Sequence, residues 1–523
     1  MNTVSKTISR IILIFSGITL AGVVILGMIL PPHNLLVKQM LPVTVLGFGA
    51  LLSVCLFFPK NLIKETEKTS RFYCILFFVL LSFFSVLIFV LNIKNPLRTD
   101  SLFDYGIITA NANNIAAGKP LETPLYYRIA LNNFKPTVLL AFLKIITGFL
   151  PGSDRGIPLL LIFTLNTTLT VLVTCLWPEG KRIWRYRILL LLLFFFLIPL
   201  YVQSGVFYTD NMTFGCAVTV LFFFKKALGF LKAEKKKSII ILLGIAAGIL
   251  FALGFAVKVT VAIPFIAASV LFILYMISHP EETRKHLKKG LLLLTLPFVL
   301  STFFVSLSLE LYCRSFEDYR IAKNTTEPVI SYVALGLTGN GSFSDNRDFA
   351  YYERYLETKE EKAAYSKEYI KENIGEFVNP SHILKKSTFN FSGGFLGADD
   401  FVRYPENENN LFFNLFDAWG KYYWRTSQYC FLYSALIYLF LLTGSIYALF
   451  FLPEKEKIPF GILLGNFTFF GLFLFLMIWE ANNRQVYNQM PLLLLSVVNT
   501  VRMIREFKNQ RRKSELPEGI QTE

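Results

Sequence analysis

The sequence predicts an all-α polytopic membrane protein, and three observations lead to this fold class. Hydrophobic residues make up 54% of the 523 residues and charged residues only 17%, whereas roughly a quarter of an ordinary globular domain is charged. Apolar runs such as 72–93 and 458–478 recur, each long enough to cross a hydrocarbon layer of ~30 Å as a helix. The net charge of +16 comes from short basic clusters between these runs. This distribution indicates membrane topology and not a nucleic-acid-binding surface, so no nucleic-acid partner is expected.

The apolar runs predict about twelve transmembrane helices. The first run lacks the small-residue cleavage site of a signal peptide and further runs follow it, so we expect a retained signal-anchor helix. In chain order the predicted helices cover residues 8–30, 41–58, 72–93, 156–177, 187–203, 209–225, 238–257, 259–277, 291–311, 428–452, 458–478 and 488–504.

The basic clusters give these helices a direction. With a cytoplasmic N-terminus every strong cluster falls in the cytoplasm, as the positive-inside rule requires, whereas the reverse orientation places all of them outside. The sequence therefore predicts a multi-pass protein of the plasma membrane with both termini in the cytoplasm. The clusters lie at 60–71, 181–187, 225–237, 284–289, 455–457 and 502–513.

This topology predicts a division of the chain. An N-terminal transmembrane module at 1–311 contains a first outer loop at 94–155. An extracytoplasmic domain follows at 312–427, where the segments are too polar for the membrane. The C-terminal transmembrane helices then occupy 428–504, and a basic cytoplasmic tail occupies 505–523.

Shorter patterns refine the two outer segments. The run 136–150 is apolar but short and contains Lys144, which predicts an amphipathic helix lying on the outer membrane surface. The Asn-rich stretch 107–117 predicts a second surface helix. Within the outer domain, charge patterning predicts helix at 346–374, and the Gly-rich stretch 387–404 predicts a loop.

Polar residues near the outer ends of the predicted helices are the candidates for a functional site. Ionisable groups at membrane depth are costly and are often functional. For any one of them, helix capping or snorkelling to the headgroups is an equally good explanation. Here, however, carboxylates and cations from distant parts of the chain are all predicted on the outer face. This combination indicates a functional site. The candidates are Asp100, Asp104, Tyr208, Asp210, Lys258, Glu480 and Arg484.

These residue types suit transfer of a sugar from a lipid phosphate. A carboxylate can take the proton of an acceptor hydroxyl as that oxygen attacks an anomeric carbon through an oxocarbenium-like state. Lysine and arginine stabilise the negative charge that grows on a departing phosphate. A membrane enzyme meets such a leaving group on a lipid-phosphate-linked sugar.

The first outer loop resembles the corresponding motif of GT-C membrane glycosyltransferases. In the protein O-mannosyltransferase and lipid A aminoarabinose transferase branch, an acidic residue precedes an Ala by eight residues and a Gly by fourteen. Asp104, Ala112 and Gly118 keep these spacings. The next element of that family, a surface helix that begins at Pro and ends at Gly, resembles 136–148.

Three later elements extend the resemblance towards the bacterial cell-envelope branch. The sequence Tyr208-Thr209-Asp210 resembles the second acidic site, and Lys258-Val-Thr resembles a Lys-Pro-Thr element with Val in place of Pro. Glu480, Arg484 and Pro491 resemble outer-face residues of related transferases. The sequence departs from the pattern at the first loop, where Tyr105 follows Asp104 and no Asp-x-Asp metal motif occurs.

The resemblance implies a GT-C-like fold and a glycosyltransferase that uses a polyprenyl-phosphate sugar donor. Asp104 is the expected base, with Asp100 as a rival on the same helix face, and Asp210 is expected to assist it. Lys258 and Arg484 are expected to bind the donor phosphate, and Asp100, Tyr208 and Glu480 to contact substrate. We expect an inverting single displacement, because the sequence places no second carboxylate as nucleophile. No cofactor is expected, and a divalent metal stays open.

The acceptor and two other classes of function remain open. The acceptor is an envelope glycopolymer, a lipid-linked glycan or a protein, so a polymerase or ligase of envelope polysaccharide is a close alternative. A transporter or flippase of lipid-linked glycans would suit twelve spans, but transporters more often place their charges near the midplane. A non-catalytic membrane scaffold would leave Asp210 and Lys258 without a role.

Overall fold

The computed structural model describes residues 3–29, 67–97, 104–153, 156–179, 183–233, 237–278, 288–402, 409–453 and 458–514. These residues form helices and turns and contain no β-strand. The longer helices are α1 (Thr3–Ile29), α3 (Glu67–Lys94), α4 (Asp104–Ala116), α5 (Phe134–Thr147), α6 (Ile157–Leu176), α7 (Ile183–Phe195), α10 (Cys216–Lys232), α11 (Lys237–Val257), α12 (Ala262–Ser278), α14 (Lys288–Ser315), α18 (Lys359–Asn373), α19 (Pro380–Phe391), α21 (Tyr423–Phe450), α22 (Phe460–Ile478) and α23 (Met490–Ser514).

Short helices connect these elements and form much of the molecule outside the long bundle. The short α-helices are α8 (Pro199–Gln203), α9 (Thr209–Thr213), α15 (Glu317–Thr325), α16 (Val329–Leu335), α17 (Arg347–Tyr355) and α20 (Leu411–Phe416). The 3₁₀ helices are η2 (Pro124–Arg128), η3 (Leu131–Asn133), η5 (Val259–Val261), η7 (Phe343–Asn346), η8 (Ile374–Val378), η9 (Ala398–Phe401) and η10 (Asn483–Gln489).

Nine stretches of the described chain are long and apolar enough to cross a membrane. They agree in position with nine of the predicted spans, and they are Lys6–Gly27, Thr69–Lys94, Ile157–Leu176, Thr209–Leu231, Lys237–Val257, Val259–Ile277, Leu292–Ser315, Tyr423–Phe450 and Phe460–Ile478. Of the other three predicted spans, 41–58 lies outside the described residues.

The remaining two predicted spans differ from single apolar membrane helices. The run 187–203 is interrupted, because α7 ends at Phe195 and α8 begins at Pro199. Proline has no N–H to donate and favours the first turn of a helix, so it starts a new helix here. The run 488–504 is helical from Met490 but continues to Ser514, and the residues of its first turns are almost all buried.

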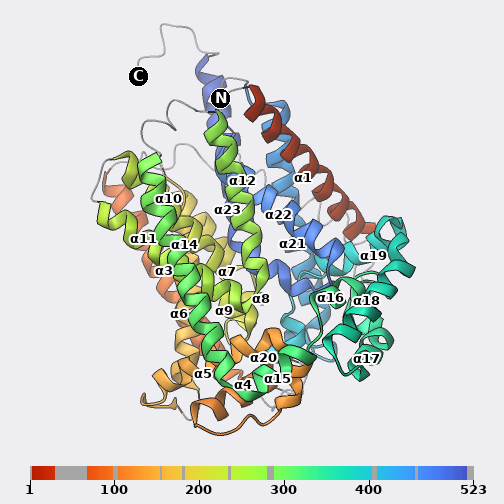
Figure 1. The fold of residues 1–523 in the computed structure, drawn as a ribbon. Coiled ribbons are helices and arrows are strands. Elements are labelled where there is room, and N and C mark those ends of the chain that lie inside the picture. The colour runs from red at the N-terminus through yellow and green to blue at the C-terminus, as the bar shows by residue number, and fades with distance from the viewer. Residues whose placement is uncertain are drawn as a thin grey trace.

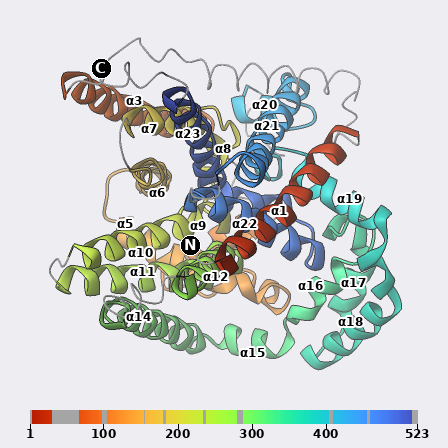
Figure 2. The same cartoon turned by 90° about the horizontal axis from the view of Figure 1, so that it is seen from above.

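Helix α23 lies at the centre of the bundle. It packs against α21 and α22 on one side and against α6 and α7 on another. Helices α10, α11 and α14 form a separate layer, which Figures 1 and 2 show on the side opposite α21. Apolar side chains on the outer surface of α14, such as Phe303 and Phe304, are more than half exposed, as expected of a face that contacts lipid. The start of α1 and the end of α23 lie at one end of the molecule, and α4 and α5 lie at the other (Figure 1).

Helices α4 and α5 pack together, and the residues of the first-loop motif explain how. Ala112 is fully buried among Leu140 and Ala141 of α5, where its small side chain permits close approach of the two helices. Gly118 follows α4 with a φ of +67°, a conformation in which glycine ends helices without steric cost. The opposite face of α5 exposes Phe142 and Ile145, in keeping with the expected surface helix.

The described parts of the segment 312–427 pack against several different elements of the chain. Helix α15 lies against η2 of the first loop, α19 packs on α1 and α22, and α20 packs on α21. Helices α16, α17 and α18 share a small core around Leu335 and Phe349 and lie together at one side of the bundle (Figures 1 and 2). The segment therefore holds the ends of several bundle helices together.

Candidate functional site

The site begins at the short helix α9, which a glycine separates from α10. Tyr208 precedes α9 in an extended conformation, and Asp210 lies in its first turn. Gly215 follows with a φ of +90°, and a Cβ there would overlap the side chain of Thr170. This break points the start of the segment into the protein, so Asp210 is completely buried instead of facing the surface.

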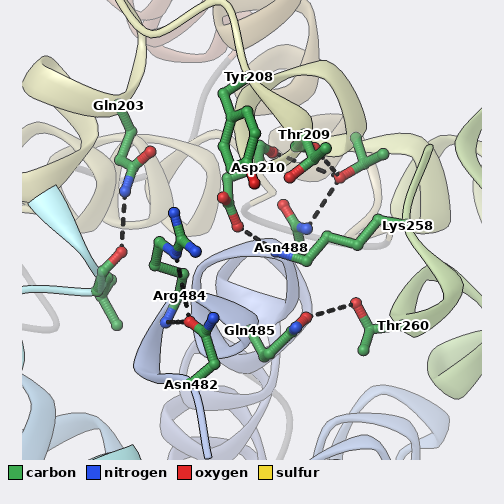
Figure 3. Close-up of polar contacts among 12 residues, drawn as sticks. Gln203, Tyr208, Thr209, Asp210, Lys258, Thr260, Asn482, Arg484, Gln485 and Asn488 are labelled. Atoms are coloured by element: carbon green, nitrogen blue, oxygen red, sulfur yellow. Dashed lines mark hydrogen bonds and ion pairs between the residues drawn. The ribbon is translucent and has the colours of Figure 1, made fainter. Parts of the chain in front are cut away.

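Asp210 forms an ion pair with Lys258, which lies 48 residues further along the chain. Lys258 is the extended residue between α11 and η5, so the turn directs its side chain back across the bundle. The side chains of Asp210 and Lys258 are 1% and 9% exposed. Burial lowers the pKa of the Lys258 ammonium, and the Asp210 carboxylate opposes this shift. Figure 3 shows the two side chains meeting from opposite walls of the site.

Tyr208 joins this ion pair to Asp104. The hydroxyl of Tyr208 donates a hydrogen bond of 2.9 Å to Oδ2 of Asp104. Asp104 is the first residue of α4, where a carboxylate is favoured by the helix dipole. Two carboxylates from positions 106 residues apart in the chain are thus linked through the Tyr208–Asp210 segment.

Arg484 supplies a second cation to the same place. Its guanidinium carbon lies 5.4 Å from the centre of the Tyr208 ring and 5.7 Å from that of Phe401, within the range of cation–π attraction. Its Nε atom lies 3.7 Å from Oδ2 of Asp400. Asn482 orients it by accepting hydrogen bonds from the backbone N–H of Arg484 and from its Nε. Figure 3 shows Arg484 facing Tyr208 from η10.

We call Asp104, Tyr208, Asp210, Lys258 and Arg484 the acidic–basic cluster. All five were candidates from the sequence, and the structure brings them together by the contacts described above. Hydrogen bonds around the cluster fix its supports, including one of 3.1 Å from Thr260 to Gln485 and one of 2.9 Å from Asn488 to Thr213 (Figure 3).

Glu480 lies beside the cluster, and Asp100 lies outside the described residues. Burial raises the pKa of Glu480 to about 7, and the Arg484 guanidinium opposes the shift. The negative charge of Asp104 also contributes to the raised pKa, which places Glu480 within electrostatic range of the cluster. Glu480 therefore titrates close to neutral pH.

Two tyrosines near Asp104, Tyr126 and Tyr332, were not assigned a role from the sequence. Burial raises the pKa of the Tyr126 hydroxyl well above its usual value, and the charge of Asp104 adds to the shift. Tyr332 of α16 is also influenced by Asp104 and stacks on Trp479 with ring centres 5.3 Å apart. Tyrosines are common in both loops, so only the fold distinguishes these two.

The predicted Gly-rich loop at 387–404 is helical up to Phe391, as part of α19, and its described remainder at 392–402 forms one wall of the site. A Cβ at Gly397 would overlap the side chain of Arg484, so glycine makes room for the guanidinium. The backbone carbonyl of Leu396 accepts a hydrogen bond of 2.9 Å from Gln203. Asp400 and Phe401 contact Arg484 from the same loop. The Gly-Gly-x-x-Gly pattern at 393–397 could have indicated this contact from the sequence, because closely spaced glycines let the backbone approach another group closely.

The acidic–basic cluster lies at the opposite end of α10 from a second group of basic residues, Lys225, Lys226 and Arg502. Helix α10 has 17 residues and is roughly 25 Å long. Asp210 precedes its start, whereas Lys225 and Lys226 in its second half pair with Glu179. Arg502 of α23 donates a hydrogen bond to the carbonyl of Glu179, so all three basic residues contact Glu179. Among the residues that the structure describes, no group of three or more His, Cys, Asp or Glu side chains could hold a metal ion.

A sequence model of one protein family, described as conserved hypothetical integral membrane protein, matches residues 1–502. The chain belongs to this family. No curated protein matches it, and no solved structure matches it. As an integral membrane protein with several membrane-capable helices, it is multi-pass and associates with a lipid bilayer. Asp104, Asp210 and Lys258 of the acidic–basic cluster all lie at or next to helix ends.

Proposed function

We propose that the protein is a GT-C-like glycosyltransferase that moves a sugar from a polyprenyl-phosphate donor to a cell-envelope acceptor on the outer face. The observation that carries the proposal is the convergence of Asp104 and Asp210 with Lys258 and Arg484 in one partly buried cluster. A glycosyl transfer from a lipid phosphate needs a base for the acceptor and cations for the leaving group. The proposal includes twelve spans, a plasma-membrane location and cytoplasmic termini.

Asp104 is the proposed base. Its Oδ2 atom accepts a hydrogen bond from Tyr208, so Oδ1 is the oxygen that takes the proton of the acceptor hydroxyl. The acceptor oxygen forms a bond to the anomeric carbon as the bond from that carbon to the phosphate oxygen breaks. The electron pair leaves with the polyprenyl phosphate, and the sugar inverts its configuration. Asp210 assists Asp104 indirectly, because it lies two residues from Tyr208, whose hydroxyl donates to Asp104.

Arg484 and Lys258 are the proposed ligands of the donor phosphate. The guanidinium of Arg484 lies close to the rings of Tyr208 and Phe401, which limits its conformational freedom before a ligand binds. Lys258 has three N–H donors. Its ion pair with Oδ1 of Asp210 needs one of them, so the others can donate to a phosphate. In a buried site these cations stabilise the phosphate charge more strongly than they would in water.

The test is transfer by the full-length protein in proteoliposomes. The donors are polyprenyl phosphates that carry radiolabelled sugars, and the acceptor is an envelope extract. Asp104→Asn is expected to reduce transfer roughly a hundredfold or more, as loss of a general base does. The matched control is Glu317→Gln, which also changes an acid at the first position of a helix, α15, outside the cluster.

Two results would overturn the proposal. If Asp104→Asn keeps full transfer while the protein remains folded, Asp104 is not the base. If the wild-type protein moves labelled lipid-linked glycan between leaflets without transferring it, the protein is a transporter. A polymerase or ligase would instead release longer glycans from the same assay.

A further inference from the structure

A second polar pocket lies between η7, α17 and α18, apart from the acidic–basic cluster. Its volume is about 520 Å³, enough for a sugar unit or two. Its lining includes four aromatic side chains and two carboxylates, and we call it the tyrosine pocket. These residues are Asp345, Asp348, Phe349, Tyr352, Tyr365 and Tyr369.

The aromatic wall of the tyrosine pocket is ordered by ring stacking. Phe349 and Tyr365 stack with their ring centres 5.2 Å apart and their planes inclined by 12°. Tyr352 lies 4.9 Å from Tyr365 and is 57% exposed, so part of its ring contacts solvent. The hydroxyl of Tyr369 forms a hydrogen bond of 2.9 Å with Thr338, which fixes that ring. The wall therefore offers aromatic faces in a fixed arrangement.

The two carboxylates supply hydrogen-bond acceptors at the rim. Oδ2 of Asp345 accepts a hydrogen bond of 3.1 Å from the backbone N–H of Asn340. Asp348 lies in the first turn of α17 and is exposed. Carboxylate oxygens accept from sugar hydroxyls, and they attract an amine but repel another carboxylate. The apolar C–H face of a pyranose ring suits the negative face of an aromatic ring.

A strap of backbone connects the tyrosine pocket to the acidic–basic cluster. Residues 338–341 run from the pocket, and the carbonyl of Gly341 accepts a hydrogen bond of 2.7 Å from the N–H of Ala481. Ala481 lies between Glu480 and Asn482, three residues before Arg484. A second contact fixes the strap, because Nδ1 of His382 lies 3.1 Å from the carbonyl oxygen of Gly339.

We infer that the tyrosine pocket binds a neutral or amine-bearing sugar unit of a glycan acceptor, away from the hydroxyl that reacts. This inference rests on the proposed function, since it names the acceptor class as glycan. Sugar units bound in the pocket lie against Thr338 and Gly339 of the strap, which is hydrogen-bonded through Gly341 to Ala481, near Arg484. The pocket thereby selects glycans over proteins and disfavours acidic sugars.

The test measures oligosaccharide binding to the full-length protein in lipid nanodiscs by saturation-transfer NMR. The probes are neutral gluco- and manno-oligosaccharides, amine-bearing glucosamine oligosaccharides and carboxylate-bearing galacturonate oligosaccharides. We expect neutral or amine-bearing probes to bind and Tyr352→Ala to weaken them roughly tenfold, because a stacking aromatic face is lost. Tyr355→Ala is the matched control, since Tyr355 is also on α17, is 85% exposed and does not line the pocket.

A second variant and a second readout separate the inference from the proposed function. Asp348→Asn is expected to weaken amine-bearing probes more than neutral ones. Asp104→Asn is expected to abolish transfer and leave binding unchanged. The inference is wrong if no probe binds, if only acidic probes bind, or if Tyr352→Ala and Tyr355→Ala bind alike. If probes bind as expected but the wild-type protein transfers no sugar, the proposed function fails and the binding site stands.

Discussion

The Lys258 ammonium and the Asp210 carboxylate form an ion pair whose two side chains are 9% and 1% exposed. Oδ2 of Asp210 has no hydrogen-bond partner among the residues that the structure describes. Removing two charges from water is costly, and their attraction often fails to offset that cost. A buried pair with an unpaired oxygen is therefore better explained by function than by stability.

A double-mutant cycle tests this explanation. Asp210→Asn and Lys258→Met are each expected to reduce the free energy of unfolding by about 3–5 kcal/mol, because each leaves one buried charge without its partner. The double variant is expected to recover most of that loss but no transfer activity. Unfolding in mixed micelles with increasing denaturant measures both effects.

The control for this cycle is an exposed ion pair. Glu179→Gln, whose carboxylate is 56% exposed and pairs with Lys226, is expected to cost less than about 1 kcal/mol. Additive losses in the Asp210 and Lys258 double variant would show that the two side chains do not depend on each other.

The hydroxyl of Tyr208 is expected to matter for the rate and not for donor binding. Tyr208→Phe keeps the ring that faces Arg484 and removes the hydrogen bond to Asp104. Loss of one charge-assisted hydrogen bond predicts a fall in kcat of roughly tenfold, with the KM for the donor nearly unchanged. Steady-state transfer kinetics measure both constants.

Tyr429→Phe is the matched control for Tyr208→Phe. The Tyr429 hydroxyl donates a hydrogen bond of 2.7 Å to the carbonyl of Phe196, outside the cluster. If Tyr208→Phe raises KM and leaves kcat unchanged, Tyr208 binds the donor and does not act on Asp104.

Gly397 controls the position of Arg484. Gly397→Ala is expected to displace the Arg484 side chain and to strain a residue whose φ is +76°. We expect the KM for the polyprenyl-phosphate donor to rise roughly tenfold, equivalent to about 1.4 kcal/mol of lost binding. Gly375→Ala is the control, because no atom lies within 4 Å of the added Cβ. An unchanged KM in Gly397→Ala would remove Arg484 from the donor site.

Glu480 predicts a specific pH dependence of stability. Its pKa is raised from 4.5 to about 7 by burial, so the folded state binds more protons than the unfolded state between these values. Stability therefore falls as the pH rises from 4.5 to 7, and the loss persists above pH 7. Glu480→Gln cannot ionise and is expected to melt a few degrees higher than the wild type at alkaline pH, corresponding to roughly 1–3 kcal/mol.

Thermal melting of both proteins across this pH range checks the prediction. The two melting temperatures are expected to converge towards the acidic end, where Glu480 is protonated in both states. A constant difference between the variant and the wild type at every pH would assign the effect of Glu480→Gln to packing.

The acidic–basic cluster was accessible from the sequence because its members interrupt apolar segments. Asp210 is the only acidic or basic residue within 188–224 and Lys258 the only Asp, Glu, Lys or Arg within 238–280, and Arg484 follows the end of an apolar run. Asp400 and Phe401 could not be assigned in this way, because these two residues reach Arg484 only in the folded protein. Pairing between residues so distant in the chain has no local sequence signal.

The membrane helices also include some features that the sequence predicts and others that only the structure shows. Runs such as 72–93 and 458–478 were predicted correctly, because long uninterrupted apolar helices are defined by composition alone. The run 187–203 is not the continuous helix that was predicted, because average hydropathy does not register the break before Pro199. The burial of α23 also escaped prediction, since apolar residues face neighbouring helices or lipid with equal preference.

The hydrogen bond from Ala481 to Gly341 limits how this protein can be recombined with its relatives. Ala481 is only 3% exposed, so a foreign segment at 312–427 whose backbone ran differently at position 341 would leave a buried N–H group unpaired. That loss would fall three residues from Arg484. A working chimera therefore has to inherit residues 336–341 and 479–484 from the same parent.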